Sequence, residues 1–327
     1  MEQHAENVAV VVHGGAGSSR SADDGCAAAA ASAMRLLAGG GEALDAVVAA
    51  VSMMEDDERF NAGTGADLRL DGATVDLDAA LMDTRGRLGA VAALRGVKNP
   101  VQVARAVANT PHHFLCGEGA QRLARLLGFA PYDPLTDRAR RRHAELLTKL
   151  AGERAAVEGV PNSAFARFWN YAAAPPAIGA SWADTRGTPV GDAAGAHARV
   201  AGGTPACDTV GAVARDAAGH FAVAGSTGGS APALLGRVGD TPLIGCGFYA
   251  APLGAIAATG TGEHIMRHLL AREVYQWIAE GMALQQALQR GVDLFDPAIP
   301  IGLIGITRDA TAVCANRDMA HAVLDHA

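Results

Sequence analysis

Thr209 opens a run of strand-forming residues in the stretch CDTVGAV, residues 207–213. A threonine hydroxyl is a weak nucleophile unless a base removes its proton, and the α-amine of an N-terminal threonine can be that base. Such an amine has an unperturbed pKa of about 7.7–8.0, so it is partly neutral near pH 7. Cleavage between Asp208 and Thr209 would create this residue, and Asp208 could take a proton or strain the bond. The alternative is an ordinary strand threonine, because β-branched residues are common in strands.

Cys207 is a second candidate nucleophile at the same place. No histidine is close to it in sequence, and a small, partly buried residue is the simpler interpretation. The five cysteines are scattered without C-x-x-C pairs, so neither a disulfide framework nor a cysteine zinc site is expected.

Two further patterns raise other functions. HGGAG at 13–17 follows an apolar run and could cradle a phosphate, but it lacks the third glycine of GxGxxG, and no GxxxxGK[ST] occurs. His264 and His268 have the spacing of two zinc ligands on a helix, but HIMRH lacks the glutamate of HExxH. A solvated or capping histidine pair is the alternative.

The N-terminal half is predicted to alternate strands and helices. Residues 7–17 predict a buried strand and a tight turn, and 21–54 predict two helices broken at 39–41, with Ser21 and Asp23 as N-caps. Residues 59–83 alternate around Asp71-Gly72 and predict a hairpin. Apolar spacing then predicts surface helices packed on the sheet, at 101–110, 118–129 and 137–171.

Residues 172–206 are rich in small residues and proline, which predicts a flexible linker. Beyond it, 208–229 predict two strands turning at Ala218-Gly219, and a further strand at 254–262 leads into one helix over 263–281. Helical and strand segments at 282–295 and 302–316 complete the chain. Neither half has enough strands for a sheet of its own, so we expect one domain with helices on both sides of a mainly antiparallel double sheet.

Composition restricts the class of protein. The chain has 327 residues, of which 50% are hydrophobic and only 5% aromatic, with 40 glycines, so its core is expected to consist of Ala, Val, Leu and Ile. The net charge of −7 comes without a basic run, which argues against nucleic acid. Residues 1–7 are polar and acidic, so no positively charged n-region precedes the short VAVVV run, and we expect no membrane segment and a cytoplasmic protein.

Long motifs resemble the isoaspartyl peptidase/L-asparaginase family of N-terminal-threonine hydrolases. They are HGGAG at 13–17, FNAGTGADLRLDGATVDLDAALMD at 60–83, DTVGAVARDAAGHFAVAGSTGG at 208–229, GRVGDTPLIGCGFYA at 236–250 and ATGTGEH at 258–264. The resemblance implies a four-layer αββα sandwich of the Ntn-hydrolase type, an α+β fold. It also implies that one domain, 1–327, is made as a precursor and cuts itself into an α chain, 1–208, and a β chain, 209–327.

The resemblance assigns roles to individual residues. Thr209 would attack the β-carbonyl of an aspartyl group, and Thr227 would polarise its hydroxyl. Thr259 and Gly260 match the oxyanion hole. Arg237 and Asp240 match the positions that hold the substrate's α-carboxylate and α-ammonium, although without the resemblance they would be interpreted as a surface ion pair. Gly260 and Gly262 would also contact substrate, and Asn61 would lie near the nucleophile.

A structural sodium ion is the only bound group that the resemblance implies, and no cofactor is expected. Its ligands would be backbone carbonyls in the loop of Met54, Glu55, Asp57, Phe60, Ala62 and Thr64. The partners expected are a small-molecule or dipeptide substrate and a second αβ unit in a dimer, with no nucleic acid and no membrane.

Two departures from the family pattern lie near the expected substrate entrance. The chain has SAPALLGR after STGG, where the family often has lysine, and Ala250-Ala251-Pro252 where the family often has Asn or Asp. Glycosylasparaginases resemble the chain less, since they have a histidine where this chain has Cys207 and their loop reads STNG. Taspase lacks the aspartate of GRVGD. Isoaspartyl dipeptides and asparagine are therefore the expected substrates. An uncleaved, non-catalytic relative is the remaining alternative.

Overall fold

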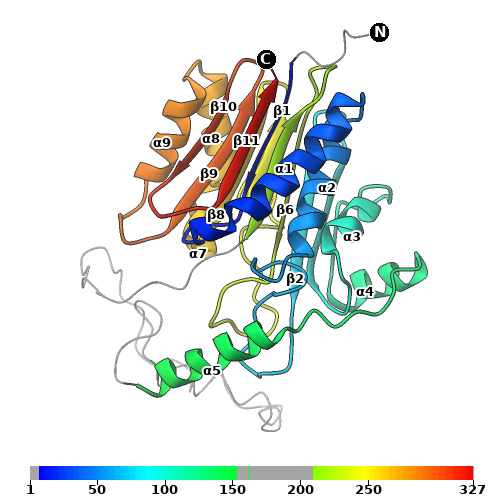
Figure 1. Ribbon diagram of the computed structural model, residues 1–327, viewed down its shortest axis with the longest axis vertical. Helices are drawn as coiled ribbons and strands as arrows, with labels where there is room; N and C mark the ends of the chain where they lie inside the picture. The colour runs from blue at the N-terminus through cyan, green and yellow to red at the C-terminus, as the bar shows by residue number, and fades with distance from the viewer. Residues whose placement is uncertain (1–6, 153–161, 163–208, 327) are drawn as a thin grey trace, which may run out of the picture.

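The computed structural model describes residues 7–152, 162 and 209–326. It is a mixed α and β structure with two sheets (Figure 1). One has seven strands in the order β11-β1-β5-β6-β2-β3-β4, and the other has four in the order β10-β9-β8-β7. All pairings are antiparallel except β3 with β4. The predicted linker, Cys207 and Asp208 lie outside the described residues.

The strands of the larger sheet are β1 (Val8–His13), β2 (Leu77–Asp83), β3 (Leu88–Leu94), β4 (Phe114–Cys116), β5 (Val210–Arg215), β6 (Phe221–Thr227) and β11 (His321–His326). Those of the smaller sheet are β7 (Phe248–Ala251), β8 (Gly254–Gly260), β9 (Ile301–Thr307) and β10 (Thr311–Ala315). The α-helices are α1 (Asp23–Ala38), α2 (Ala43–Glu55), α3 (Pro100–Val107), α4 (Gly117–Leu126), α5 (Asp137–Ala151), α7 (Gly262–His268), α8 (Leu270–Ala279) and α9 (Leu284–Asp293).

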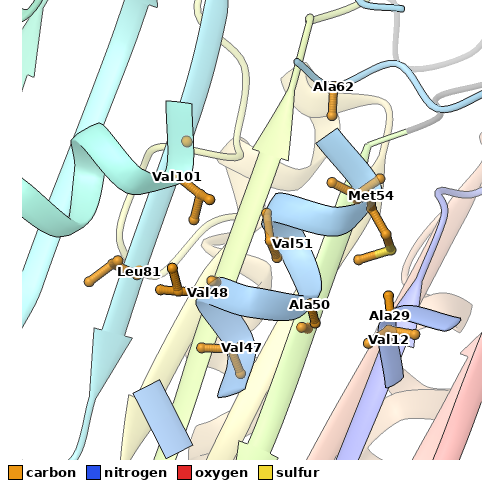
Figure 2. Packing of buried hydrophobic residues seen from close by; sticks show 14 of the residues in the cluster. Val12, Ala29, Val47, Val48, Ala50, Val51, Met54, Ala62, Leu81 and Val101 are labelled. Atoms are coloured by element: carbon orange, nitrogen blue, oxygen red, sulfur yellow. The ribbon is translucent and has the colours of Figure 1, made fainter. Parts of the chain in front are cut away.

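Apolar side chains fill three regions. Helices α1, α2 and α3 pack on the larger sheet, and Figure 2 shows side chains of α2 between Val12 of β1 and Val101 of α3. A second cluster joins the facing sides of the two sheets, with Val11 and Val223 on one side and Phe248 and Ile304 on the other. A third joins α8 and α9 to the smaller sheet. Helices therefore cover the outer face of each sheet.

Strands from both halves of the sequence share the larger sheet. β1 lies between β5 and β11, and β6 pairs with β2 (Figure 1). This confirms the prediction that the early and late strands share a core. The predicted strands at 7–17, 208–229 and 254–262 and the two helices within 21–54 are also confirmed.

The predicted hairpin around Asp71-Gly72 is wrong. Asp71 Oδ1 accepts the backbone N–H groups of Ala73 and Thr74, so this segment closes a tight loop outside the sheet. The hairpin is formed instead by β2 and β3. β2 is buried along nearly its whole length, so its sequence does not separate a buried face from a solvent-exposed one.

Other predictions also fail at helix ends. Helix α1 has Ala22 as its N-cap, without a side-chain hydrogen bond, while Asp23 pairs with Arg20. The predicted helix over 263–281 is broken at Leu269, whose φ of 48° is left-handed, into α7 and α8.

Helix α5 also departs from the prediction, because it lies away from both sheets (Figure 1). It is tied to the loop before β2 by the Arg142–Asp67 ion pair instead of packing on a sheet. None of the helices in the described segments has an apolar run that could span a bilayer.

Candidate active site

Thr209 immediately precedes β5, and Thr227 ends the neighbouring strand β6. The antiparallel register pairs Val210 with Ser226, which places the two threonines side by side. Thr209 Oγ1 donates a hydrogen bond to Thr227 Oγ1 at 3.0 Å, and Thr227 Oγ1 also accepts the N–H of Gly229 at 3.0 Å. Both sequence-predicted threonines therefore meet through their hydroxyls.

Asn61 holds the STGG loop in place. Its Nδ2 donates to the Gly229 carbonyl at 2.6 Å, its own carbonyl accepts Gly228 N–H at 2.8 Å, and its Oδ1 accepts Asp67 N–H. Gly228 must be glycine because a Cβ there would lie 2.3 Å from Asn61 Oδ1. The structure thus places Asn61 behind the loop that carries Thr227.

The two threonines lie in one pocket with three of the four predicted substrate-binding residues, Arg237, Asp240 and Gly260, whereas Gly262 is not part of its lining. Its lining comprises Thr209, Thr227, Gly229, Ser230, Arg237, Gly239, Asp240, Thr241 and Gly260. Arg237 makes a two-pronged ion pair with Glu263 at the start of α7, with Nε–Oε1 and Nη2–Oε2 distances of 2.9 Å. The interpretation of Arg237 and Asp240 as a surface ion pair is therefore wrong: Arg237 pairs with Glu263, and Asp240 is buried.

Two buried carboxyl groups near this pocket have altered acidity. Burial raises the pKa of Asp240 to about 7 against the opposing effect of Arg237, with Glu263 and Asp78 raising it further. Burial likewise raises the pKa of Asp78 to about 6, although the Ala93 N–H and two arginines oppose it. Asp78 is the β2 residue paired with Thr227. One acid in the pocket lining, Asp240, and one behind it, Asp78, therefore have pKa values that burial raises towards neutral pH.

Thr259 and Gly260 end β8 on the opposite sheet. Thr259 is fully buried, and its Oγ1 accepts the Ala16 N–H of the HGGAG loop at 3.3 Å. Gly260 has a φ of 145°, and a Cβ there would lie 2.2 Å from the Pro300 carbonyl. Gly260 lines the pocket with the threonines, and a Cβ on Gly262 would meet Asp240 Oδ1 at 2.8 Å.

The HGGAG loop serves the fold and is not a phosphate cradle. The N–H groups of Gly14 and Gly17 donate to the carbonyls of Ala320 and Asp318, and that of Ala16 donates to Thr259. These donors are therefore occupied. The phosphate interpretation is wrong.

His13 lies beneath Thr209 and was not predicted as a site residue. Burial lowers its pKa to about 3, so the ring is neutral, and the backbone of Thr209 faces it. Neither ring nitrogen has a hydrogen bond of good geometry among the described residues. A Cβ on Gly211 would lie 2.3 Å from His13 Nε2, so only glycine lets β5 approach this close.

The predicted sodium loop turns from the end of α2 towards β2. The carbonyls of Met54, Glu55 and Asp57 accept the N–H groups of Asp57, Thr64 and Phe60 respectively. A carbonyl oxygen has two lone pairs, so these bonds still allow a cation to bind. The Glu55 side chain is buried, accepts the Val101 N–H, and has its pKa raised to about 8 by burial. Backbone oxygen is a ligand type that a hard cation takes, and the sodium ion itself stays a prediction.

Side-chain metal sites are not found in the described segments, where no three His, Cys, Asp or Glu residues gather. The rings of His264 and His268 instead pack edge-on against Phe295, with centroids 6.5 and 4.9 Å away. The described residues include no third side chain that would complete a zinc site with this pair.

Sequence reasoning missed the charged residues that lie behind the pocket, Arg69, Asp76 and Asp78. All three are buried to within 1% exposure. The three charged residues could have been noticed, because they lie inside the long family motif at 60–83. Only the three-dimensional structure shows that their side chains are buried.

Comparisons with known proteins identify the family of the chain. The asparaginase family profile matches residues 6–326, and the chain belongs to that family. It is 38% identical over 257 residues to the plant-type L-asparaginase of Pyrococcus abyssi, covering 77% of this chain and 71% of that one. It is 35% identical over 255 residues to the isoaspartyl peptidase/L-asparaginase of Mus musculus, covering 76% and 64%. The protein is therefore a hydrolase.

Proposed function

We propose that the protein cuts itself between Asp208 and Thr209 and then hydrolyses β-aspartyl dipeptides and L-asparagine. The observation that carries the proposal is the 3.0 Å hydrogen bond between the Thr209 and Thr227 hydroxyls, in one pocket with Arg237 and Asp240. The names of the relatives, isoaspartyl peptidase and L-asparaginase, support the substrate class.

The freed α-amine of Thr209 takes the hydroxyl proton as the Thr209 oxygen attacks the substrate's β-carbonyl carbon. Thr227 orients the nucleophile, because its oxygen accepts from both Thr209 and Gly229 N–H. Negative charge develops on the carbonyl oxygen, where Thr259 and the Gly260 N–H act as donors. The carbon–nitrogen bond breaks, and the departing amine or ammonia takes the proton held by the α-amine. Water then hydrolyses the β-aspartyl ester, with the same amine as base.

Arg237 and Asp240 select a substrate with a free α-carboxylate and α-ammonium. Ion pairing with Glu263 aligns the planar Arg237 guanidinium, which suits two-pronged binding of a carboxylate. Asp240 is buried beside it and, when ionised, attracts the ammonium group. Retaining both groups in one pocket favours a small zwitterionic aspartyl substrate.

The proposal extends to the wider architecture. Helix layers on the outer faces of two packed sheets support the αββα arrangement of the Ntn hydrolases. The loop from Met54 to Thr64 would hold a structural sodium ion through backbone carbonyls, and two αβ units would form the working dimer. No organic cofactor takes part in the proposed steps, and the protein would act in the cytoplasm.

Intact-mass measurement under denaturing conditions tests the proposal, combined with hydrolysis assays on β-Asp-Leu and asparagine. We expect two fragments summing to the chain, the smaller beginning at Thr209, and turnover that develops as the fragments appear. An intact chain that hydrolyses β-aspartyl peptides at full rate would exclude the amine mechanism. An intact chain without turnover would indicate an uncleaved, non-catalytic relative.

A further inference from the structure

Arg69 and Asp76 form a buried ion pair behind the pocket. Arg69 Nε lies 3.3 Å from Asp76 Oδ2, and the side chains are 1% and 0% exposed. The tight loop closed by Asp71 lies between them in sequence and returns the chain on itself, with Arg69 N–H donating to the Thr74 carbonyl. The loop around Asp71-Gly72, for which a hairpin was wrongly predicted, is therefore the segment that brings Arg69 and Asp76 together.

The Asp76 carboxylate accepts hydrogen bonds from three segments of the chain. Besides Arg69, its Oδ1 accepts from Arg95 Nε at 2.6 Å, and its Oδ2 accepts the Gly236 N–H at 3.4 Å. Gly236 begins the stretch GRVGD that carries Arg237 and Asp240. A buried carboxylate therefore fixes one end of the substrate-binding loop.

Arg69 reaches both catalytic loops. Its Nη2 donates to the Arg237 carbonyl at 3.4 Å. Its Nη1 lies against Gly229, where a Cβ would be only 2.5 Å away, and has no hydrogen-bond partner in the described part of the chain. Gly229 is the residue whose N–H donates to Thr227 Oγ1. One guanidinium group thus supports the loop of the nucleophile's partner and the loop of the carboxylate-binding arginine.

We propose that the Arg69–Asp76 pair is a positioning element that sets the loop 227–230 and the loop 236–240 relative to each other. This inference rests on the proposed function for its kinetic consequences, but its geometric claim stands independently. Neither residue lines the pocket, so neither touches substrate. Their effect is exerted through Gly229, Gly236 and Arg237.

Arg69→Met tests the proposal, because Asp76 keeps Arg95 and the Gly236 N–H as partners. We expect hydrogen exchange of the amides in 227–240 to become faster. We also expect kcat/KM for β-Asp-Leu to fall about 100-fold, with kcat lower and KM higher, since displacements near 1 Å at reacting groups have effects of this size. Arg69→Lys keeps the charge but not the fork, so it should give an intermediate result in both measurements.

Arg215→Met is the matched control, because Arg215 is another 1%-exposed arginine, at the far end of β5. It should lower the unfolding midpoint while leaving exchange in 227–240 and kcat/KM within twofold of wild type. Unchanged exchange in 227–240 for Arg69→Met, or equal kinetic losses in the two variants, would overturn the proposal. If Arg69→Met does not fold, a Lys variant indistinguishable from wild type would overturn it.

The failure of the proposed function would be distinct. Wild-type protein that neither cuts itself nor hydrolyses substrate would disprove that function. The exchange measurement would still decide whether Arg69 positions the two loops.

Discussion

The two ends of β5 each have a buried arginine beside them, and the two arginines are held differently. Arg215 donates to the carbonyls of Asn7, Thr307 and Arg308 at 2.6–2.9 Å and pairs with Asp325. Arg69, near the Thr209 end, makes contacts of 3.3–3.5 Å, and one nitrogen lacks a partner.

The same difference holds for other polar atoms. Oxygens of Asp78 and Asp240 and the ring of His13 also lack good partners among the described residues, and all lie near Thr209 or Thr227. Unsatisfied buried groups cost stability, and folded proteins keep few of them. One end of the sheet is thus organised for stability, and the end that carries the pocket retains buried polar atoms without partners among the described residues.

Thr209→Ala should have the largest effect on activity, and this effect should be confined to the end of β5 that carries Thr209 and the pocket. Loss of the nucleophile should abolish both self-cleavage and turnover, lowering activity by at least about 10⁴-fold. Intact mass and hydrolysis of asparagine measure the two effects. Residual turnover at a tenth of the wild-type rate would show that another group, with Cys207 the first to test, is the nucleophile.

Arg215→Met should lower stability through the Arg215 end of β5 and leave the pocket unchanged. Removing one partner of a buried, hydrogen-bonded charge network lowers the free energy of unfolding by about 3–5 kcal/mol. Urea unfolding of the uncut Thr209→Ala form provides a single-chain measurement, with Arg215→Lys as the milder control. A similar loss of kcat/KM at a temperature where the variant is folded would contradict the division between the two ends.

Arg237→Ala should cripple substrate binding and spare self-cleavage. Loss of a charge-assisted, two-pronged contact with the α-carboxylate should raise KM by about 100-fold, a change near 3 kcal/mol. Glu263→Gln is the control, because it removes only the charge on α7 that pairs with Arg237. The Glu263 side chain is 55% exposed. Equal cleavage defects in Arg237→Ala and Thr209→Ala would contradict the separate roles.

Asp240→Asn should change how stability depends on pH. The folded-state pKa of Asp240, about 7, lies above its ordinary value of 3.8, with Arg237, Glu263 and Asp78 facing it. Between these values the unfolded chain binds fewer protons, so stability falls as pH rises from about 4 through 7.

Asp240→Asn lacks this loss of stability. The free energy of unfolding of the variant minus that of the parent should therefore be larger at pH 8 than at pH 5, by about 1 kcal/mol or more. Urea midpoints at the two pH values, in the Thr209→Ala form, measure the change. A pH-independent difference would show that Asp240 is not buried in its neutral form.

The sequence predicted the parts of the fold that form locally. The strand at Thr209, the turn at Ala218-Gly219 and the two helices within 21–54 follow from periodicity and glycine placement. The family motifs also named Thr209, Thr227, Arg237, Asp240 and Gly260, and the structure places these five residues in the lining of one pocket.

What failed depended on distant partners. β11 is an edge strand whose pairing with β1 spans nearly the whole chain, and its half-exposed residues give no strong pattern. The hairpin at Asp71-Gly72 was predicted because the turn signal of an Asp-Gly pair lies in neighbouring residues. The pairing of β2 with β6 joins residues far apart in the sequence and leaves no local signal. The burial of Arg69 and His13 is set by tertiary neighbours, which override the preference of polar residues for the surface.

The strand order of the larger sheet has a consequence for the proposed cut. β1 would belong to one product, yet it is flanked on both sides by β5 and β11 of the other, and β6 of that second product pairs with β2 of the first. Separating the two products would therefore require three strand-to-strand interfaces to open at once. Cleavage would change the connectivity of the molecule without releasing either piece, and the new chain end would stay in the pocket where it was formed.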